Sequence, residues 1–168
     1  LTRWISKCKP YKNYSNGSIV ISRRGVAVAT IGGLEESKVT WSEERLRMLD
    51  QMVTDLESAI ASKKVRGVVF ASPGKDCFVF GADLKELSQQ TSIERCREAI
   101  EQGHRVFGRV RALPVKTVAA VQGACVGGGL EFALHCDEIV ACKTKGPHSA
   151  PFESEKTKFG LPEVMLGI

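Results

Sequence analysis

The sequence has no apolar run that approaches the roughly 20 residues that a helix needs to cross a bilayer. It also lacks any C-x-x-C pair, and its three histidines do not stand at zinc-ligand spacing from its cysteines. These absences argue against a helical membrane span and against a structural zinc site. Several cysteines lie in apolar stretches, so we interpret all six as reduced thiols, which favours an intracellular compartment. They are Cys8, Cys77, Cys96, Cys125, Cys136 and Cys142.

Acidic residues are missing from the first 34 positions, which carry six lysines and arginines. The other 134 residues hold 18 basic and 19 acidic side chains, so the net charge of +5 comes from this leading segment. We predict that residues 1–18 form a flexible basic leader and that residues 19–168 form one domain. An acid-free basic leader is typical of the end of a transit peptide, and a solvated linker is the alternative. Nucleic-acid binding is not expected, because no RNA-module signature is present.

Apolar runs of two kinds alternate along the rest of the chain. Short ones predict strands over 26–31, 65–71, 115–121 and 138–142. Helical spacing predicts one helix from a capping box at Thr40 and Glu43 to about residue 61, and another over about 92–112. The apolar face of the second helix is expected to consist of Ile93, Cys96, Ile100, Phe107 and Val110. This alternation indicates an α/β domain, with a polar loop over 143–158.

Glycines stand where two expected strands pass into helices, at Gly81-Ala82-Asp83 and at Gly127-Gly128-Gly129. Asp83 is suited to cap a short helix. A glycine run at a helix start exposes backbone N–H groups that bind a phosphate or a developing oxyanion. A dinucleotide fingerprint would need glycine at Phe132, and no Gly-Lys-Ser/Thr of a P-loop follows. An oxyanion hole therefore remains, with tight helix–strand packing as the alternative.

Two isolated acids stand in apolar surroundings. Glu131 lies between Leu130 and Phe132, and Glu163 follows Pro162. Each is by itself compatible with a structural or surface acid. Two such acids combined with two loops of backbone donors would form an acid–base site.

Three blocks of the sequence, in this order, resemble the signature blocks of the crotonase superfamily of enoyl-CoA hydratases and isomerases. They are FVFGADL at 78–84, PVKTVAAVQGACVGGGLE at 114–131 and GLPEVMLG at 160–167. The resemblance covers about residues 20–168 and is strongest to the N-terminal hydratase domain of the multifunctional α-subunits of fatty acid β-oxidation. It implies an α/β, crotonase-like spiral of repeated β-β-α units. The chain stops in the middle of the family pattern, so we expect a domain truncated at its C-terminal side.

The resemblance also implies roles for individual residues. The backbone N–H groups of Ala82 and Gly128 would form the oxyanion hole, and Glu131 and Glu163 would be the catalytic acids. Contacts to CoA would come from Gly81, Ala82, Asp83, Leu84, Gly127 and Gly128. No metal and no cofactor is expected, since CoA is part of the substrate. A homo-oligomer of trimer type or a β-oxidation complex is the expected assembly. The expected location is mitochondrial, with a peroxisomal-type organelle or the bacterial cytoplasm as alternatives.

The resemblance implies hydration of trans-2-enoyl-CoA to 3-hydroxyacyl-CoA, since family members with other reactions often lack one of the two acids. An enoyl-CoA isomerase is the nearest alternative, because it needs the same oxyanion hole. A truncated, non-catalytic assembly or binding fragment and an RNA-binding relative of the hydratases are further alternatives. One departure from the family is Phe80, which stands where a small residue is usual and would crowd the CoA chain.

Overall fold

The structure, a computed structural model, describes residues 9–33, 36, 38–73, 77–89, 92–142 and 157–166. The larger sheet has the strand order β1-β2-β3-β4-β6-β8 and the smaller sheet the order β5-β7-β9. The strands of the larger sheet are β1 Lys12–Tyr14, β2 Gly17–Ile21, β3 Val26–Ile31, β4 Gly67–Ala71, β6 Lys116–Val121 and β8 Glu138–Ala141. Those of the smaller sheet are β5 Cys77–Val79, β7 Ala124–Val126 and β9 Lys158–Gly160.

Three parallel strands of the larger sheet are each followed by a strand of the smaller sheet and then by a helix. β4, β6 and β8 lead to β5, β7 and β9, and these lead to α3 (Leu84–Gln89) with α4 (Ile93–Arg111), to α5 (Gly128–Leu134) and to α6 (Glu163–Leu166). Pairing is parallel from β3 through β4 and β6 to β8, and also within the smaller sheet. The predicted α/β fold of repeated β-β-α units is therefore confirmed.

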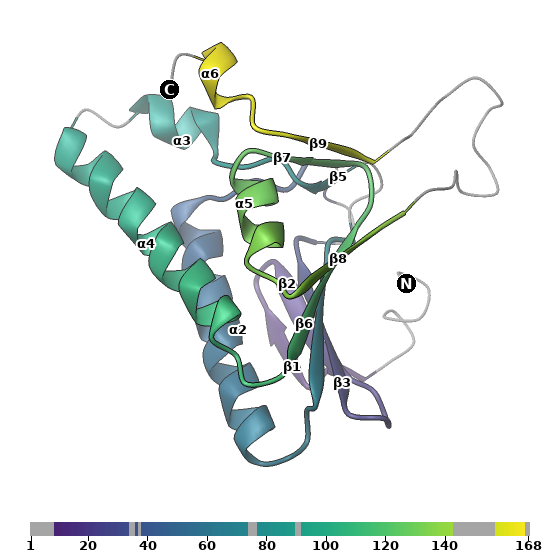
Figure 1. Ribbon diagram of the computed structural model, residues 1–168. Helices are drawn as coiled ribbons and strands as arrows, with labels where there is room; N and C mark the ends of the chain where they lie inside the picture. Colours follow the sequence, from purple (N-terminus) through teal and green to yellow (C-terminus); the bar gives the residue numbers. More distant parts are fainter. Residues whose placement is uncertain are drawn as a thin grey trace, which may run out of the picture.

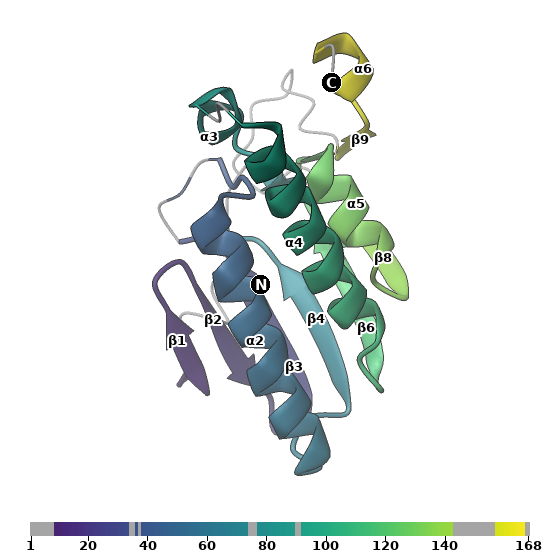
Figure 2. The same cartoon turned by 90° about the vertical axis from the view of Figure 1, so that its left-hand side faces the viewer.

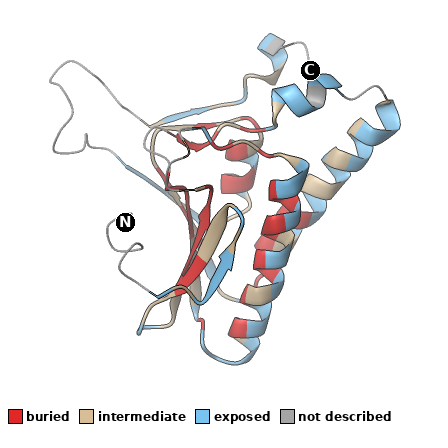
Figure 3. Ribbon diagram, turned by 180° about the vertical axis from the view of Figure 1, so that it is seen from behind, coloured by how far each residue is buried: buried red, intermediate tan, exposed pale blue. Residues whose placement is uncertain are grey.

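Two long helices, α2 (Glu43–Ala61) and α4, lie side by side across one face of the larger sheet (Figures 1 and 2). The side of α2 that faces the sheet is buried, as the burial colouring shows (Figure 3), because its apolar residues recur every three or four positions. An aromatic cluster joins the helices to the sheets and consists of Trp41, Phe70, Phe78, Phe107 and Phe132. Within the described part of the chain, no helix is long and apolar enough to cross a bilayer.

The predicted start of α2 is wrong by two residues. Its N-cap is Ser42, whose side chain accepts a hydrogen bond from the Arg45 amide at 3.2 Å. The Thr40 hydroxyl instead donates to the Asp83 carboxylate at 3.0 Å. Thr40 precedes Trp41, which pairs with Ala82, so the chain is still extended there and starts the helix only afterwards.

The expectation of a flexible leader over 1–18 is wrong for residues 12–18. β1 and β2 form an antiparallel hairpin, and β2 pairs with β3 at the edge of the larger sheet. The Tyr14 hydroxyl donates to the Asp55 carboxylate of α2 at 2.7 Å. β2 contributes an apolar run of only three residues, in which Ile19 and Val20 are both buried, and so short a run does not stand out in the sequence. Residues 1–8 lie outside the described residues.

The apolar face predicted for α4 is buried only in its C-terminal half. Phe107 and Val110 are buried, whereas Ile93 and Ile100 are 76% and 55% exposed. The N-terminal half of the helix extends beyond α2 and the sheet (Figure 1). Two strands were missed as well: β7 lies in the Gly-Ala-Cys segment, and β9 begins at the end of the predicted loop 143–158. Residues 143–156 of that loop are outside the described residues.

Candidate active site

The segment Gly81–Asp83, which follows β5, runs parallel to the residues before α2. Trp41 pairs with Ala82 across this contact: the Trp41 amide donates to the Gly81 carbonyl at 2.6 Å, and the Asp83 amide donates to the Trp41 carbonyl at 3.1 Å. In extended chain, N–H groups alternate in direction. The Ala82 N–H therefore points away from Trp41.

Asp83 fixes the start of α3. Its carboxylate accepts hydrogen bonds from the amides of Lys85 at 3.0 Å and Glu86 at 3.2 Å, so the predicted helix cap is confirmed. The predicted CoA-contact residue Leu84 follows it and is exposed. Phe80, which departs from the family pattern, is half-buried, and its side chain packs against the hydrophobic core.

Each glycine of the run that opens α5 has its own structural reason. Gly127 has a φ of +55°, a conformation that favours glycine. A Cβ atom on Gly129 would lie 2.0 Å from the Val79 carbonyl oxygen, so only glycine lets α5 approach β5 this closely. A Cβ atom on Gly128 would lie 3.2 Å from Cδ1 of Trp41. The alternative of tight helix–strand packing is thus correct for Gly129, and Gly128 remains available as a donor.

The two glycine loops meet. Gly81 has a φ of +107°, and a Cβ atom on it would lie 3.0 Å from the Gly128 backbone nitrogen. Among the described residues, neither the Ala82 N–H nor the Gly128 N–H has a hydrogen-bond partner. Two such donors on adjoining loops are chemically suited to bind a carbonyl oxygen that gains negative charge.

Both predicted acids reach this same loop. Oε1 of Glu163 lies 2.8 Å from the position of a Cβ atom on Gly127, and Oε2 of Glu131 lies 3.5 Å from that of a Cβ atom on Gly128. Glu131 stands in the first turn of α5, and Glu163 begins α6. The segment before α6 is held by a hydrogen bond from the Gly127 amide to the Gly160 carbonyl at 2.9 Å. The structure therefore brings Glu131 and Glu163 to the loop of Gly127 and Gly128, which adjoins the loop of Gly81.

Oε2 of Glu163 is buried and has no hydrogen-bond partner within the described residues. An unsatisfied buried carboxylate oxygen is costly, and such atoms are usually satisfied by a ligand or a water molecule. The atom thus points to a polar group that binds beside the glycine loop.

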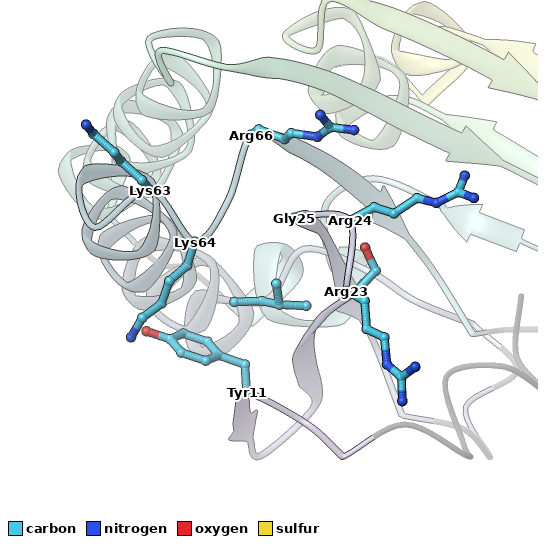
Figure 4. A pocket seen from close by; sticks show the side chains of 9 residues that line it. Tyr11, Arg23, Arg24, Gly25, Lys63, Lys64 and Arg66 are labelled. Carbon is cyan, nitrogen blue, oxygen red and sulfur yellow. The ribbon is translucent and has the colours of Figure 1, made fainter.

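An open hollow lies at the opposite end of the molecule, at the turn between β2 and β3 and the end of α2 (Figure 4). It contains five cationic side chains and no acid, and the Lys64 ammonium lies 6.0 Å from the centre of the Tyr11 ring. A site without a carboxylate has no acid–base pair, so we do not assign the chemistry to this hollow. Its lining residues are Tyr11, Ile21, Ser22, Arg23, Arg24, Gly25, Lys63, Lys64 and Arg66.

The cap of α3 is expected to make stability depend on pH. The hydrogen bond from the Glu86 amide, with those from Thr40 and Lys85, holds the pKa of Asp83 below its ordinary value. A lowered pKa in the folded state contributes stability above the unfolded-state pKa of about 3.9, and this is lost as pH falls through the folded-state pKa. Asp83→Asn keeps a capping oxygen but cannot ionise.

The unfolding free energy of wild type should therefore be higher than that of Asp83→Asn, and this difference should be larger at pH 7 than at pH 2.5. Urea unfolding of the two proteins at several pH values measures the difference. A gap that does not change with pH would contradict the prediction.

Comparison with known proteins identifies the family of the chain. The family model for enoyl-CoA hydratase/isomerase matches residues 45–168. The fatty acid oxidation complex subunit alpha of Shewanella loihica is 39% identical over 144 residues, which are 86% of this chain and 19% of that protein. The corresponding subunit of Shewanella amazonensis is 35% identical over 150 residues, 88% of this chain and 19% of that protein. The chain thus spans about a fifth of the length of these relatives.

Solved structures share the fold. The enoyl-CoA hydratase from Bacillus anthracis has a TM-score of 0.76 at 25% identity, and the match covers 92% of this chain and 53% of that one. An enoyl-CoA hydratase/carnithine racemase from Magnetospirillum magneticum has a TM-score of 0.78 at 23% identity, with 94% and 53% covered. The predicted crotonase-like fold is confirmed. From the family model, the relatives and this fold, we conclude that the chain belongs to the enoyl-CoA hydratase/isomerase family.

Proposed function

We propose that the protein adds water to trans-2-enoyl-CoA thioesters and forms 3-hydroxyacyl-CoA. The observation that carries this proposal is the meeting of two carboxylates, Glu131 and Glu163, with two N–H groups on adjoining glycine loops that have no partner within the described residues. An isomerase needs the same pair of N–H donors but adds no water. Hydration needs one group that accepts a proton from the water and another that donates a proton to the α-carbon. Two acids supply both groups.

The thioester carbonyl is proposed to accept hydrogen bonds from the N–H groups of Ala82 and Gly128. As water attacks the β-carbon, the C=C electrons move toward the carbonyl, and its oxygen gains enolate charge. Fixed donors stabilise that charge more than they stabilise the neutral substrate. Removing one donor of this kind costs about 3–4 kcal/mol. The two amides thus lower the barrier for addition to an otherwise unreactive double bond.

The two acids divide the proton transfers. Glu131 orients the water and accepts its proton as the oxygen bonds to the β-carbon. Glu163 donates a proton to the α-carbon, and the enolate electrons form the new C–H bond. Over the cycle one water is consumed, and the proton taken by one acid is returned through the other. None of these steps requires a metal or a redox cofactor. That the protein uses neither remains a prediction.

The relatives bear on the substrate, the assembly and the location. They are named as subunits of a fatty acid oxidation complex, which supports a fatty acyl-CoA as substrate and assembly with other subunits or copies. Shewanella is bacterial, so these relatives give the mitochondrial location no support and fit the bacterial cytoplasm. We propose that location. A trimer-type homo-oligomer remains a prediction.

Hydration is tested with crotonyl-CoA and the purified protein. The expected result is loss of the absorbance of the enoyl thioester and appearance of 3-hydroxybutyryl-CoA by mass spectrometry, with saturated butyryl-CoA as the unreactive control. Interconversion of 3-enoyl-CoA and 2-enoyl-CoA without hydration would favour the isomerase. Absence of both reactions would contradict the proposal.

A second candidate function is that of an assembly fragment, and one observation favours it. Val164 and Met165 of α6 are 83% and 87% exposed directly after Glu163, and exposed apolar side chains promote association. If the 168-residue chain is such a fragment, it should associate in analytical ultracentrifugation and lack hydratase activity. A monomeric, active chain would exclude this candidate.

A further inference from the structure

Trp41 contacts both loops that carry the oxyanion donors, although it belongs to neither. It lies in the extended segment before α2, far in sequence from Gly128. We infer that Trp41 is a positioning residue that sets the spacing between the N–H groups of Ala82 and Gly128. This inference rests on the proposed function, because it assigns a role within that site.

The backbone of Trp41 fixes the first loop. Its N–H and its carbonyl bond to Gly81 and Asp83, at 2.6 and 3.1 Å, on either side of Ala82. These two hydrogen bonds hold the peptide groups around Ala82 in an extended conformation. The Ala82 N–H is thereby kept on the side away from Trp41, where it remains unpartnered among the described residues.

The side chain of Trp41 fixes the second loop. The indole Nε1–H, which can only donate, forms a hydrogen bond of 2.9 Å to the Gly128 carbonyl. Cδ1 of the ring also occupies the space beside Gly128, because a Cβ atom placed there would lie only 3.2 Å away. Trp41 therefore bonds to one loop through its backbone and to the other through its side chain.

The indole is itself held in place. Trp41 is buried, and its ring lies 5.2 Å from that of Phe107 and 5.3 Å from that of Phe132, measured between ring centres. Packed aromatic rings in these tilted arrangements have little freedom to rotate. The position of the Gly128 carbonyl is thus tied to the aromatic core.

Such an anchor matters here because the donor loops are rich in glycine. Gly81, Gly127 and Gly128 have no side chains to restrict them, and glycine has the largest conformational freedom. A displacement of about 1 Å in a catalytic arrangement can cost about 10²-fold in rate. The hydrogen bond from Trp41 restricts the backbone of Gly128, which has no side chain that could do so.

The test removes only the indole hydrogen bond. Replacing Trp41 with β-(3-benzothienyl)alanine substitutes sulfur for N–H at nearly the same shape, and Trp41→Phe is the simpler variant. We expect kcat for crotonyl-CoA hydration to fall about 10- to 100-fold and KM to change less than about threefold. The reason is that the lost hydrogen bond stabilises the transition state more than it stabilises the bound substrate. A kcat within about threefold of wild type in the benzothienyl variant would overturn the inference.

Phe70→Leu is the matched control for a merely structural role. Phe70 is fully buried, and its ring centre lies 5.3 Å from that of Phe132, on which Trp41 also packs. The substitution should lower the unfolding midpoint at least as much as Trp41→Phe while kcat stays near wild type. If Phe70→Leu lowers kcat as strongly as the Trp41 variants at equal loss of stability, Trp41 acts only through the core.

A binding measurement separates this inference from the proposed function. In nitrogen-15 NMR spectra, butyryl-CoA should shift the amide signals of Ala82 and Gly128 together in wild type. In the benzothienyl variant the Gly128 shift should be much smaller. If wild type fails to hydrate crotonyl-CoA but shows this pattern, the proposed reaction is wrong and the role of Trp41 stands. Equal shifts in both proteins would overturn the role of Trp41.

Discussion

Replacing Glu163 with glutamine is expected to lower the turnover of crotonyl-CoA by about 10²–10⁴-fold. Glutamine keeps the shape of the side chain but cannot donate the proton that the α-carbon needs. Glu131→Gln should lower turnover over the same range, because an amide is a poor acceptor of the proton of the water. Steady-state rates of the single variants and the double variant measure these effects.

Two further features make the experiment decisive. The double variant should lose far less than the product of the single losses, since residues that act as a unit are not additive. Binding of butyryl-CoA should change little, because the thioester contacts are proposed to come from the amides of Ala82 and Gly128. Turnover close to wild type in Glu163→Gln would falsify the assigned role.

Glu94→Gln is the matched control. Glu94 is an exposed acid in the first turn of α4, just as Glu131 is an acid in the first turn of α5. If Glu131 served only to complement a helix terminus, the two substitutions would have similar, small effects on stability and none on turnover. We expect a large loss of turnover from Glu131→Gln alone.

Substituting alanine for Gly129 is expected to have the largest effect on stability. The added Cβ would lie 2.0 Å from the Val79 carbonyl oxygen and 2.7 Å from its carbonyl carbon. Both atoms are backbone within the buried strand β5, so they cannot turn aside as a flexible side chain would. α5 would have to move away from the smaller sheet, and we expect a loss of about 3 kcal/mol or more.

The same substitution at Gly108 provides the control with the opposite sign. Gly108 lies inside α4, and a Cβ atom there meets no atom within 4 Å. Alanine should therefore stabilise the helix by about 0.5–1 kcal/mol. Urea unfolding of both variants gives the comparison. An unfolding free energy for Gly129→Ala within about 1 kcal/mol of wild type would show that α5 does not pack on β5 as described.

The sequence by itself located the residues that we propose to carry the chemistry. Glycine runs, a helix-capping aspartate and isolated acids are local patterns, because each follows from the conformation or charge of neighbouring residues. Together with the resemblance of three sequence blocks to one family, these patterns locate the Gly81 and Gly127 loops, Glu131 and Glu163. The strands with strongly apolar runs and the two long helices are predictable for the same reason.

What the tertiary structure decided is which of these parts meet. Burial along α4 depends on how far α2 and the sheet extend beside it, and periodicity alone could not distinguish the buried Phe107 from the exposed Ile93. The β1–β2 hairpin exists because β3 offers it an edge. Trp41 carried no signal of its own, since its contacts with Gly81 and Gly128 join segments 40 and 87 positions away. Contacts between distant segments depend on the packing of the whole chain, and no local pattern encodes them.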